Sequence, residues 1–156
     1  MGAAPVPPAP PYEFIPMRGE DVELVLGIEQ GIYAFPWTRG NFEDSLASGY
    51  TAWLMRDGRH LVGYAVMMRI LDEAHLLNIS IITERQHAGL GGLMLESLCE
   101  EARSQGVARM ILEVRESNAV GRAFYQRHGF LQIGERLDYY PAERGRESAL
   151  VLEKKI

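Results

Sequence analysis

What this chain lacks excludes several kinds of chemistry. Cys99 is the only cysteine in 156 residues, so no internal disulfide is possible and a disulfide scaffold is excluded. Cys99 also follows the helical apolar pattern of Leu95 and Leu98, which predicts a small buried hydrophobe rather than a nucleophile. The four histidines form no HExxH or paired Cys/His motif, so we predict no metal site. A lone cysteine is typical of a reducing compartment, and we expect a cytoplasmic protein.

Membrane and export signals are also missing. No segment approaches the roughly eighteen apolar residues that span a bilayer. The first eleven residues contain five prolines and do not resemble a secretory signal. We predict a flexible Pro/Ala-rich tail over residues 1–12, a single domain over residues 13–156 and no membrane association.

The chain has no excess of basic residues. Its net charge is −5 and its isoelectric point is about 5.4, which argues against direct nucleic-acid binding. An acidic surface would favour a basic protein partner. No feature of the sequence demands an oligomer, so we expect a monomer.

Glycine, by contrast, is concentrated in one short segment. Residues 86–92 read Gln-His-Ala-Gly-Leu-Gly-Gly and separate a strand-like apolar run from an amphipathic helix. Such a turn can present the N–H groups of the first helical turn to an anion, and a diphosphate would fit. The segment is no Walker loop, and Met94 breaks the dinucleotide-binding fingerprint. A tight strand-to-helix turn without a ligand is the alternative interpretation.

Apolar periodicity and turn residues predict an α/β protein, with a mixed sheet and helices on its faces. The predicted strands are 13–17, 50–56, 61–71, 74–82, 109–114, 131–139 and 147–153. The predicted helices are 20–34, one from Thr38 or Asn41 to Ala47, one from the glycine turn to Gln105, and 118–127.

Several motifs together resemble one superfamily. Gln86, Gly89 and Gly91 form a Gln-x-x-Gly-x-Gly pattern that resembles the acetyl-CoA loop of the GCN5-related N-acetyltransferase (GNAT) superfamily. Residues 112–118 and 124–130 resemble the fifth strand and fourth helix of that superfamily, in the same order. The similarity runs from about residue 14 to the C-terminus. Segments 34–37, 71–79 and 138–147 further resemble the RimI-type ribosomal-protein-alanine N-acetyltransferases.

The resemblance implies a fold and a reaction. The fold would be a single GNAT-like domain, with a mostly antiparallel sheet of about seven strands and about four helices. Acetyl-CoA would be the co-substrate, without a metal, and the acceptor would be the N-terminal amine of a protein, such as an alanine of a small-subunit ribosomal protein. The same machinery could instead acetylate a lysine or a small-molecule amine. A non-catalytic acyl-CoA sensor is a further alternative.

The reaction poses two proton problems, which the resemblance assigns to two residues. An α-amino group is mostly ammonium at neutral pH and must lose a proton before it attacks. Glu113 matches the family's base, although it could instead be a solvated strand residue or an ion-pair partner of Arg115. Tyr125 matches the family's proton donor to the departing thiolate, although it could be a core aromatic. Glu73 and His75, which share a strand face, are rival bases.

The resemblance also assigns the binding residues. Asn118 matches a residue that contacts CoA, although an asparagine there could equally cap a helix. His87 and Gly92 stand where the family often has arginine, so charge neutralisation should be weaker, and protonation of His87 should tighten CoA binding as pH falls. The implied CoA-binding residues are Ile79, Ser80 and Ile81, through their backbone, and His87, Ala88, Gly89, Leu90, Gly91, Gly92 and Asn118. The implied acceptor-binding residues are Phe35, Trp37, Tyr139 and Tyr140, on loops stiffened by Pro36 and Pro141.

Overall fold

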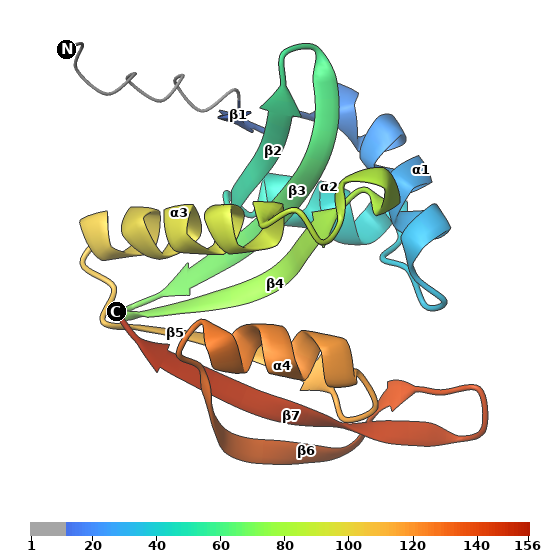
Figure 1. The fold of residues 1–156 in the computed structure, drawn as a ribbon, viewed down its shortest axis with the longest axis vertical. Coiled ribbons are helices and arrows are strands. Elements are labelled where there is room, and N and C mark those ends of the chain that lie inside the picture. Colours follow the sequence, from blue (N-terminus) through green and yellow to red (C-terminus); the bar gives the residue numbers. More distant parts are fainter. Residues whose placement is uncertain (1–11) are drawn as a thin grey trace, which may run out of the picture.

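A computed structural model describes residues 12–156, which form one seven-stranded sheet with helices on both faces (Figure 1). The strand order is β1-β2-β3-β4-β5-β7-β6, and only β4 and β5 run parallel. The strands are β1 (Tyr12–Pro16), β2 (Thr51–Asp57), β3 (His60–Ile70), β4 (Glu73–Ile81), β5 (Arg109–Arg115), β6 (Leu131–Pro141) and β7 (Arg146–Lys155). The α-helices are α1 (Val22–Ile32), α2 (Arg39–Ala47), α3 (Leu90–Ser104) and α4 (Ala119–Arg127), and two 3-10 turns are η1 (Gly19–Asp21) and η2 (Thr83–Arg85).

This architecture confirms the predicted fold class, the mixed and mostly antiparallel sheet, and the order of the elements. The prediction of a flexible N-terminal tail falls on residues 1–11, which lie outside the described residues, and on Tyr12, where β1 begins. None of the helices within residues 12–156 combines the length and the apolar character needed to span a bilayer.

Residues near the ends of α1 and α2 explain where these helices end or begin. Thr38 caps α2 as expected: its hydroxyl accepts from the Asn41 N–H at 3.2 Å, and the Asn41 side chain accepts from the Thr38 N–H at 2.9 Å. The predicted end of α1 at Ala34 is wrong by two residues, because α1 ends at Ile32 and Tyr33 is already extended. Pro36 disfavours helical backbone just before it, and the chain leaves the helix early. We call residues 33–38 the α1–α2 segment.

The two faces of the sheet bury separate cores. Along β3, Tyr64 and Val66 face α1 and α2, whereas Ala65 and Met67 face α3. Cys99 lies in the α3 core with 1% of its surface exposed, and burial raises the pKa of its thiol. Its side chain therefore packs as an apolar group, as its helical position predicted.

The sheet opens between its two parallel strands. β4 and β5 pair over only four positions, from Glu73 opposite Arg109 to Leu76 opposite Leu112. Beyond them, residues 78–81 stay paired with β3 and residues 113–115 stay paired with β7. Each half of the sheet keeps its outer neighbour while the two inner edges separate, as the diverging ribbons of β4 and β5 show (Figure 1). The inner edge of β4 is thus left without a strand partner along residues 77–81.

Candidate active site

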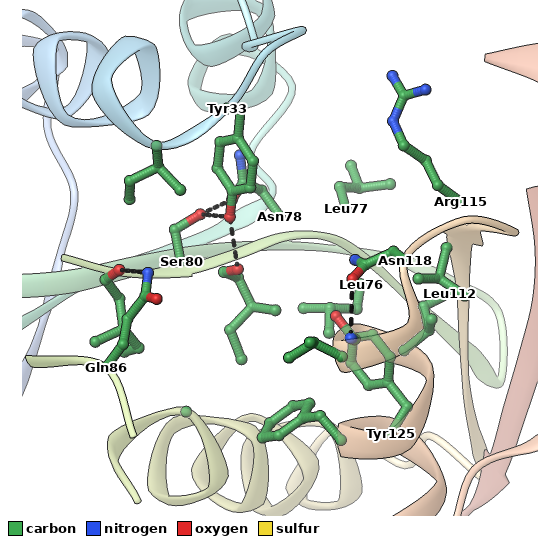
Figure 2. A pocket seen from close by; sticks show the side chains of 18 of the residues that line it. Tyr33, Leu76, Leu77, Asn78, Ser80, Gln86, Leu112, Arg115, Asn118 and Tyr125 are labelled. Atoms are coloured by element: carbon green, nitrogen blue, oxygen red, sulfur yellow. Dashed lines mark hydrogen bonds between the residues drawn. The ribbon is translucent and has the colours of Figure 1, made fainter. Parts of the chain in front are cut away.

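A cavity of about 1300 Å³ lies where β4 and β5 separate (Figure 2). This volume exceeds the roughly 300–1,000 Å³ of common small-molecule pockets, so a long ligand and part of a second one fit. Its lining comes from residues 76–81 of β4, residues 112–115 of β5, the start of α3, one side of α4, the end of β6 and the α1–α2 segment. Within residues 12–156, no cluster of His, Cys, Asp or Glu is arranged to hold a metal ion.

The glycine turn forms one end of this cavity. Gly89 is the N-terminal boundary residue of α3 and has a left-handed backbone with φ of +81°, while His87 also has a positive φ of +63°. A Cβ on Gly92 would lie 2.9 Å from the His128 ring, and one on Gly91 would lie 3.4 Å from the Phe124 ring. The glycines therefore serve the turn and the packing of α4, while the turn still faces the cavity. His87 and residues 89–92 line the cavity; Ala88 does not.

The backbone of β4 is arranged as expected for pairing with an added chain. The Ile82 N–H donates to the Val62 carbonyl at 2.9 Å. Because bonded and non-bonded pairs alternate along an antiparallel ladder, the backbone groups of Ile81 and Ile79 point away from β3 and toward the cavity. The Ile81 carbonyl accepts from the Gln86 side chain at 3.0 Å. By the same alternation, the backbone of Ser80 faces β3, and its hydroxyl lies 2.6 Å from that of Tyr33.

Glu113 lines the cavity from β5, while its neighbours Leu112 and Val114 are buried, as their alternation predicted. Its carboxylate pairs with Arg136 of β6, whose Nε lies 2.9 Å from Oε1. The alternative that Glu113 pairs with Arg115 is wrong, because Arg115 pairs with Glu147 at 2.9 Å. About a quarter of the Glu113 side chain is exposed, so its carboxylate remains accessible despite the ion pair.

Tyr125 packs its ring in the core and also lines the cavity. Its ring packs edge-on against Phe124 and Phe130, at 5.2 and 5.7 Å between ring centroids. Its hydroxyl lines the cavity without a hydrogen bond to any of residues 12–156, and Figure 2 shows the side chain reaching into the pocket from α4. Burial raises the pKa of this hydroxyl well above its usual value, so the group stays protonated at neutral pH.

Asn118 is both a helix cap and a cavity-lining residue. It caps α4, with its side-chain oxygen accepting from the Gly121 N–H at 2.9 Å, and it lines the cavity beside Tyr125 (Figure 2). The cap uses the amide oxygen, so the amide N–H groups can still donate to a ligand.

Three of the four predicted acceptor-side aromatics line the cavity. Phe35 and Trp37 come from the α1–α2 segment and Tyr140 from the end of β6. Tyr139 does not line it: this side chain is 43% exposed and its ring stacks on Arg136. The register of β6 shifts between Arg136 and Tyr140, and Asp138 has a positive φ, so alternation along this strand is broken where Tyr139 sits.

The rival bases lie elsewhere. Glu73 and His75 occupy the closed end of β4 and β5, where Glu73 pairs with Arg109 and with His75, and neither lines the cavity. Side-chain hydrogen bonds from Arg109 and His75 lower the pKa of Glu73. These residues hold the closed end of the sheet together.

Among the cavity residues that the sequence did not single out, Glu29 and Tyr33 belong to one hydrogen-bond network. Glu29 of α1 is only 2% exposed, and it accepts from the Trp37 N–H at 2.9 Å, the Tyr64 hydroxyl at 2.7 Å and the Asn78 amide at 3.1 Å. Tyr33 joins this network through Ser80, whose hydroxyl donates to the Asn78 side chain at 2.7 Å (Figure 2). The only sequence signal is a glutamate within the apolar stretch of α1, which must find partners if buried.

The sequence and the fold that surround this cavity are similar to those of known proteins. The Acetyltransferase (GNAT) family profile matches residues 22–130. The chain belongs to the GNAT family of acetyltransferases. It is 36% identical, over 132 residues, to the ribosomal protein bS18-alanine N-acetyltransferase of Escherichia coli strain K12; the match covers 85% of this chain and 89% of the relative.

Solved GNAT structures agree. The crystal structure of the ribosomal-protein-S18-alanine N-acetyltransferase of Escherichia coli superposes with a TM-score of 0.86 at 34% identity, covering 93% of this chain and 94% of that one. A PaiA N-acetyltransferase from Thermoplasma acidophilum, in complex with coenzyme A, shares the fold at 18% identity, with a TM-score of 0.75 and coverage of 93% and 99%. The resemblance inferred from the motifs is therefore confirmed, and this GNAT protein is an acyltransferase.

Proposed function

We propose that this GNAT protein transfers the acetyl group of acetyl-CoA to the α-amino group of a protein N-terminus, with an N-terminal alanine of a ribosomal protein as the first candidate acceptor. The observation that carries the proposal is that Glu113, Tyr125 and the glycine turn line one cavity. The acetyltransferase from Escherichia coli that is 36% identical to this chain acts on ribosomal protein bS18 at alanine, which supports the choice of acceptor.

The donor end would hold acetyl-CoA mainly through backbone groups. The N–H groups at the start of α3 suit a diphosphate, because they are unpaired donors at the positive end of the helix dipole. The outward-facing backbone of Ile79 and Ile81 suits the amides of the pantetheine arm, which would extend the sheet from β4. Asn118 can donate to the same arm near the thioester.

Glu113 then serves as the general base. It accepts a proton from the ammonium form of the acceptor, directly or through one water, and the freed amine attacks the thioester carbonyl carbon. The new C–N bond forms, the C–S bond breaks, and the products are an N-terminal amide and CoA. Arg136 contacts Oε1 of Glu113, so the carboxylate keeps a fixed orientation while its second oxygen can take the proton.

Tyr125 stabilises the departing sulfur. A thiol has an ordinary pKa of about 8.5, whereas burial raises the pKa of Tyr125 above the usual tyrosine value of about 10. Complete proton transfer from Tyr125 to the thiolate is therefore uphill. We infer that Tyr125 acts as a hydrogen-bond donor to the sulfur as charge develops, and that the final proton on CoA comes from the proton released by the amine.

One peptide pair tests the acceptor. CoA release is measured with a basic peptide that begins with alanine, and with the same peptide blocked at its N-terminus but retaining its lysines; mass spectrometry locates the acetyl group. Acetylation of the free N-terminus alone is expected. Acetylated lysines on the blocked peptide would identify a lysine acetyltransferase. Acetyl-CoA binding without turnover on either peptide would contradict the proposal and favour a small-molecule acceptor or a sensor.

A further inference from the structure

Arg115 joins the two acceptor-side segments of the cavity. It ends β5 two residues after Glu113 and therefore lies on the same strand face. Its guanidinium carbon is 4.8 Å from the ring centroid of Phe35, in the α1–α2 segment, and 4.5 Å from that of Tyr140, in β6. Figure 2 shows Arg115 at the margin of the pocket. Two segments more than a hundred residues apart in the chain thus meet on one side chain.

Hydrogen bonds fix this guanidinium in place. Its Nη1 donates to the Pro141 carbonyl at 2.7 Å and to Oε1 of Glu147 at 2.9 Å. The other oxygen of Glu147 accepts from the Ser117 N–H at 3.2 Å. An arginine can offer a planar face to aromatic rings while donating in its plane, and a lysine offers no such combination. The contacts therefore depend on arginine and not only on positive charge.

The local charges are balanced. An isolated cation at the cavity mouth would repel an ammonium acceptor, but Glu147 neutralises Arg115. Hydrogen bonds from Ser117 and Arg115 lower the pKa of Glu147, so the pair stays ionised at neutral pH. Arg115 therefore helps to shape the acceptor end of the cavity, while the Arg115–Glu147 pair adds little net charge there.

We propose that Arg115 is a positioning residue for the acceptor: by holding Phe35 and Tyr140 together, it fixes the acceptor end of the cavity before the peptide arrives. This inference rests on the proposed function and names the residue that sets the fit of the acceptor. A preformed binding surface lowers the ordering cost of binding. Loss of the link should weaken peptide binding and leave the acetyl-CoA site, built by β4 and α3, intact.

Arg115→Gln and Arg109→Gln form a matched pair for the test. Arg109 is also on β5 and also pairs with two carboxylates, Glu73 and Glu153, but it lies at the closed end of the strand outside the cavity. We expect Arg115→Gln to raise the KM for the alanine-starting peptide about tenfold, to change kcat less than threefold, and to leave the Kd of acetyl-CoA unchanged. Arg109→Gln should change none of these constants, whatever it does to stability.

Two further measurements separate the possible failures. A double-mutant cycle combines Phe35→Leu with Arg115→Gln. Both substitutions break the same Phe35–Arg115 contact, so the KM of the double variant should not exceed the higher KM of the two single variants. Additive increases in KM would overturn the inference. Amide hydrogen exchange should accelerate in residues 33–37 and 138–141 of Arg115→Gln and not of Arg109→Gln. Unchanged exchange would also overturn it. If the wild-type protein acetylates no peptide, the proposed function is contradicted. The hydrogen-exchange comparison still tests whether Arg115 holds the two segments together.

Discussion

The two ends of the cavity are built from different parts of the chain. At the donor end, the β4 edge and the glycine turn present mostly backbone, and His87 is the one ionisable residue of the turn segment 86–92. At the acceptor end, side chains make the surface, with an arginine against two rings and a carboxylate held by Arg136. Backbone sites tolerate sequence change as long as the conformation is kept, whereas side-chain sites change with single substitutions. If the proposed function is right, single substitutions should therefore change the choice of acceptor more easily than the binding of acetyl-CoA.

The sharpest test of the acceptor end is Glu113→Gln. This substitution keeps the shape of the side chain and removes the proton acceptor, so turnover should fall by roughly 10²- to 10⁴-fold, the usual range for loss of a general base. The Kd of acetyl-CoA, measured by calorimetry, should not change. Glu73→Gln is the control, because Glu73 lies outside the cavity, and its turnover should match wild type. If Glu113→Gln keeps full turnover, the base is another residue or water.

Tyr125→Phe tests the boundary between the two ends, where the thioester would sit. The loss of one hydrogen bond to a charged sulfur should cost about 1.5–3 kcal/mol, or roughly a 10- to 100-fold drop in kcat. Burial raises the Tyr125 pKa, so the hydroxyl remains protonated, and able to donate, until pH rises past its shifted value. In wild type, kcat should therefore show no decline between about pH 8.5 and pH 10. A decline there that Tyr125→Phe abolishes would contradict this assignment.

The sequence was informative wherever the signal was local. Period-two strands, the Thr38 cap and the glycine turn each depend on neighbouring residues, so the order of elements could be predicted. The partner of Glu113 could not. Arg136 reaches it from two strands away, across β7, where Val151 lies between Glu113 and the side-chain-free Gly134. That neighbourhood depends on the strand order, which no local pattern contains.

The buried network around Glu29 shows the same limit. Its donors Tyr64 and Asn78 are 35 and 49 residues away in the chain, and they meet it only because α1 packs on β3 and β4. The sequence showed a glutamate among the apolar residues of α1, which departs from an amphipathic pattern, but it did not show which residues would contact that glutamate. Tyr139 stacks on Arg136 outside the cavity lining for a related reason, since a shift of register in β6 breaks the alternation that places side chains.

Gly89→Ala tests whether the donor end is a backbone site. Alanine in the left-handed conformation costs about 1–2 kcal/mol, so the turn should distort and the Kd of acetyl-CoA should weaken about three- to tenfold. Gly27→Ala, in the interior of α1 with no atom within 4 Å of the new Cβ, is the matched control. It should leave the Kd unchanged and stabilise the fold by about 0.5–1 kcal/mol, measured by denaturant unfolding. Equal Kd values for the two variants would show that the turn does not contact the ligand.

The smallest expected effect is electrostatic and belongs to the one ionisable side chain of the glycine turn. His87 lines the cavity beside the turn that would hold the diphosphate, so we expect CoA to bind more tightly at pH 6 than at pH 8. A charge near a helix terminus contributes about 0.3–1 kcal/mol, which predicts a two- to fivefold tighter Kd of CoA at the lower pH. His87→Gln removes the imidazole, so the difference between its pH profile and that of wild type separates the histidine from the protonation of the ligand phosphates. If the two profiles run parallel, the imidazole adds nothing to the binding of the diphosphate, and the glycine turn contributes through its backbone.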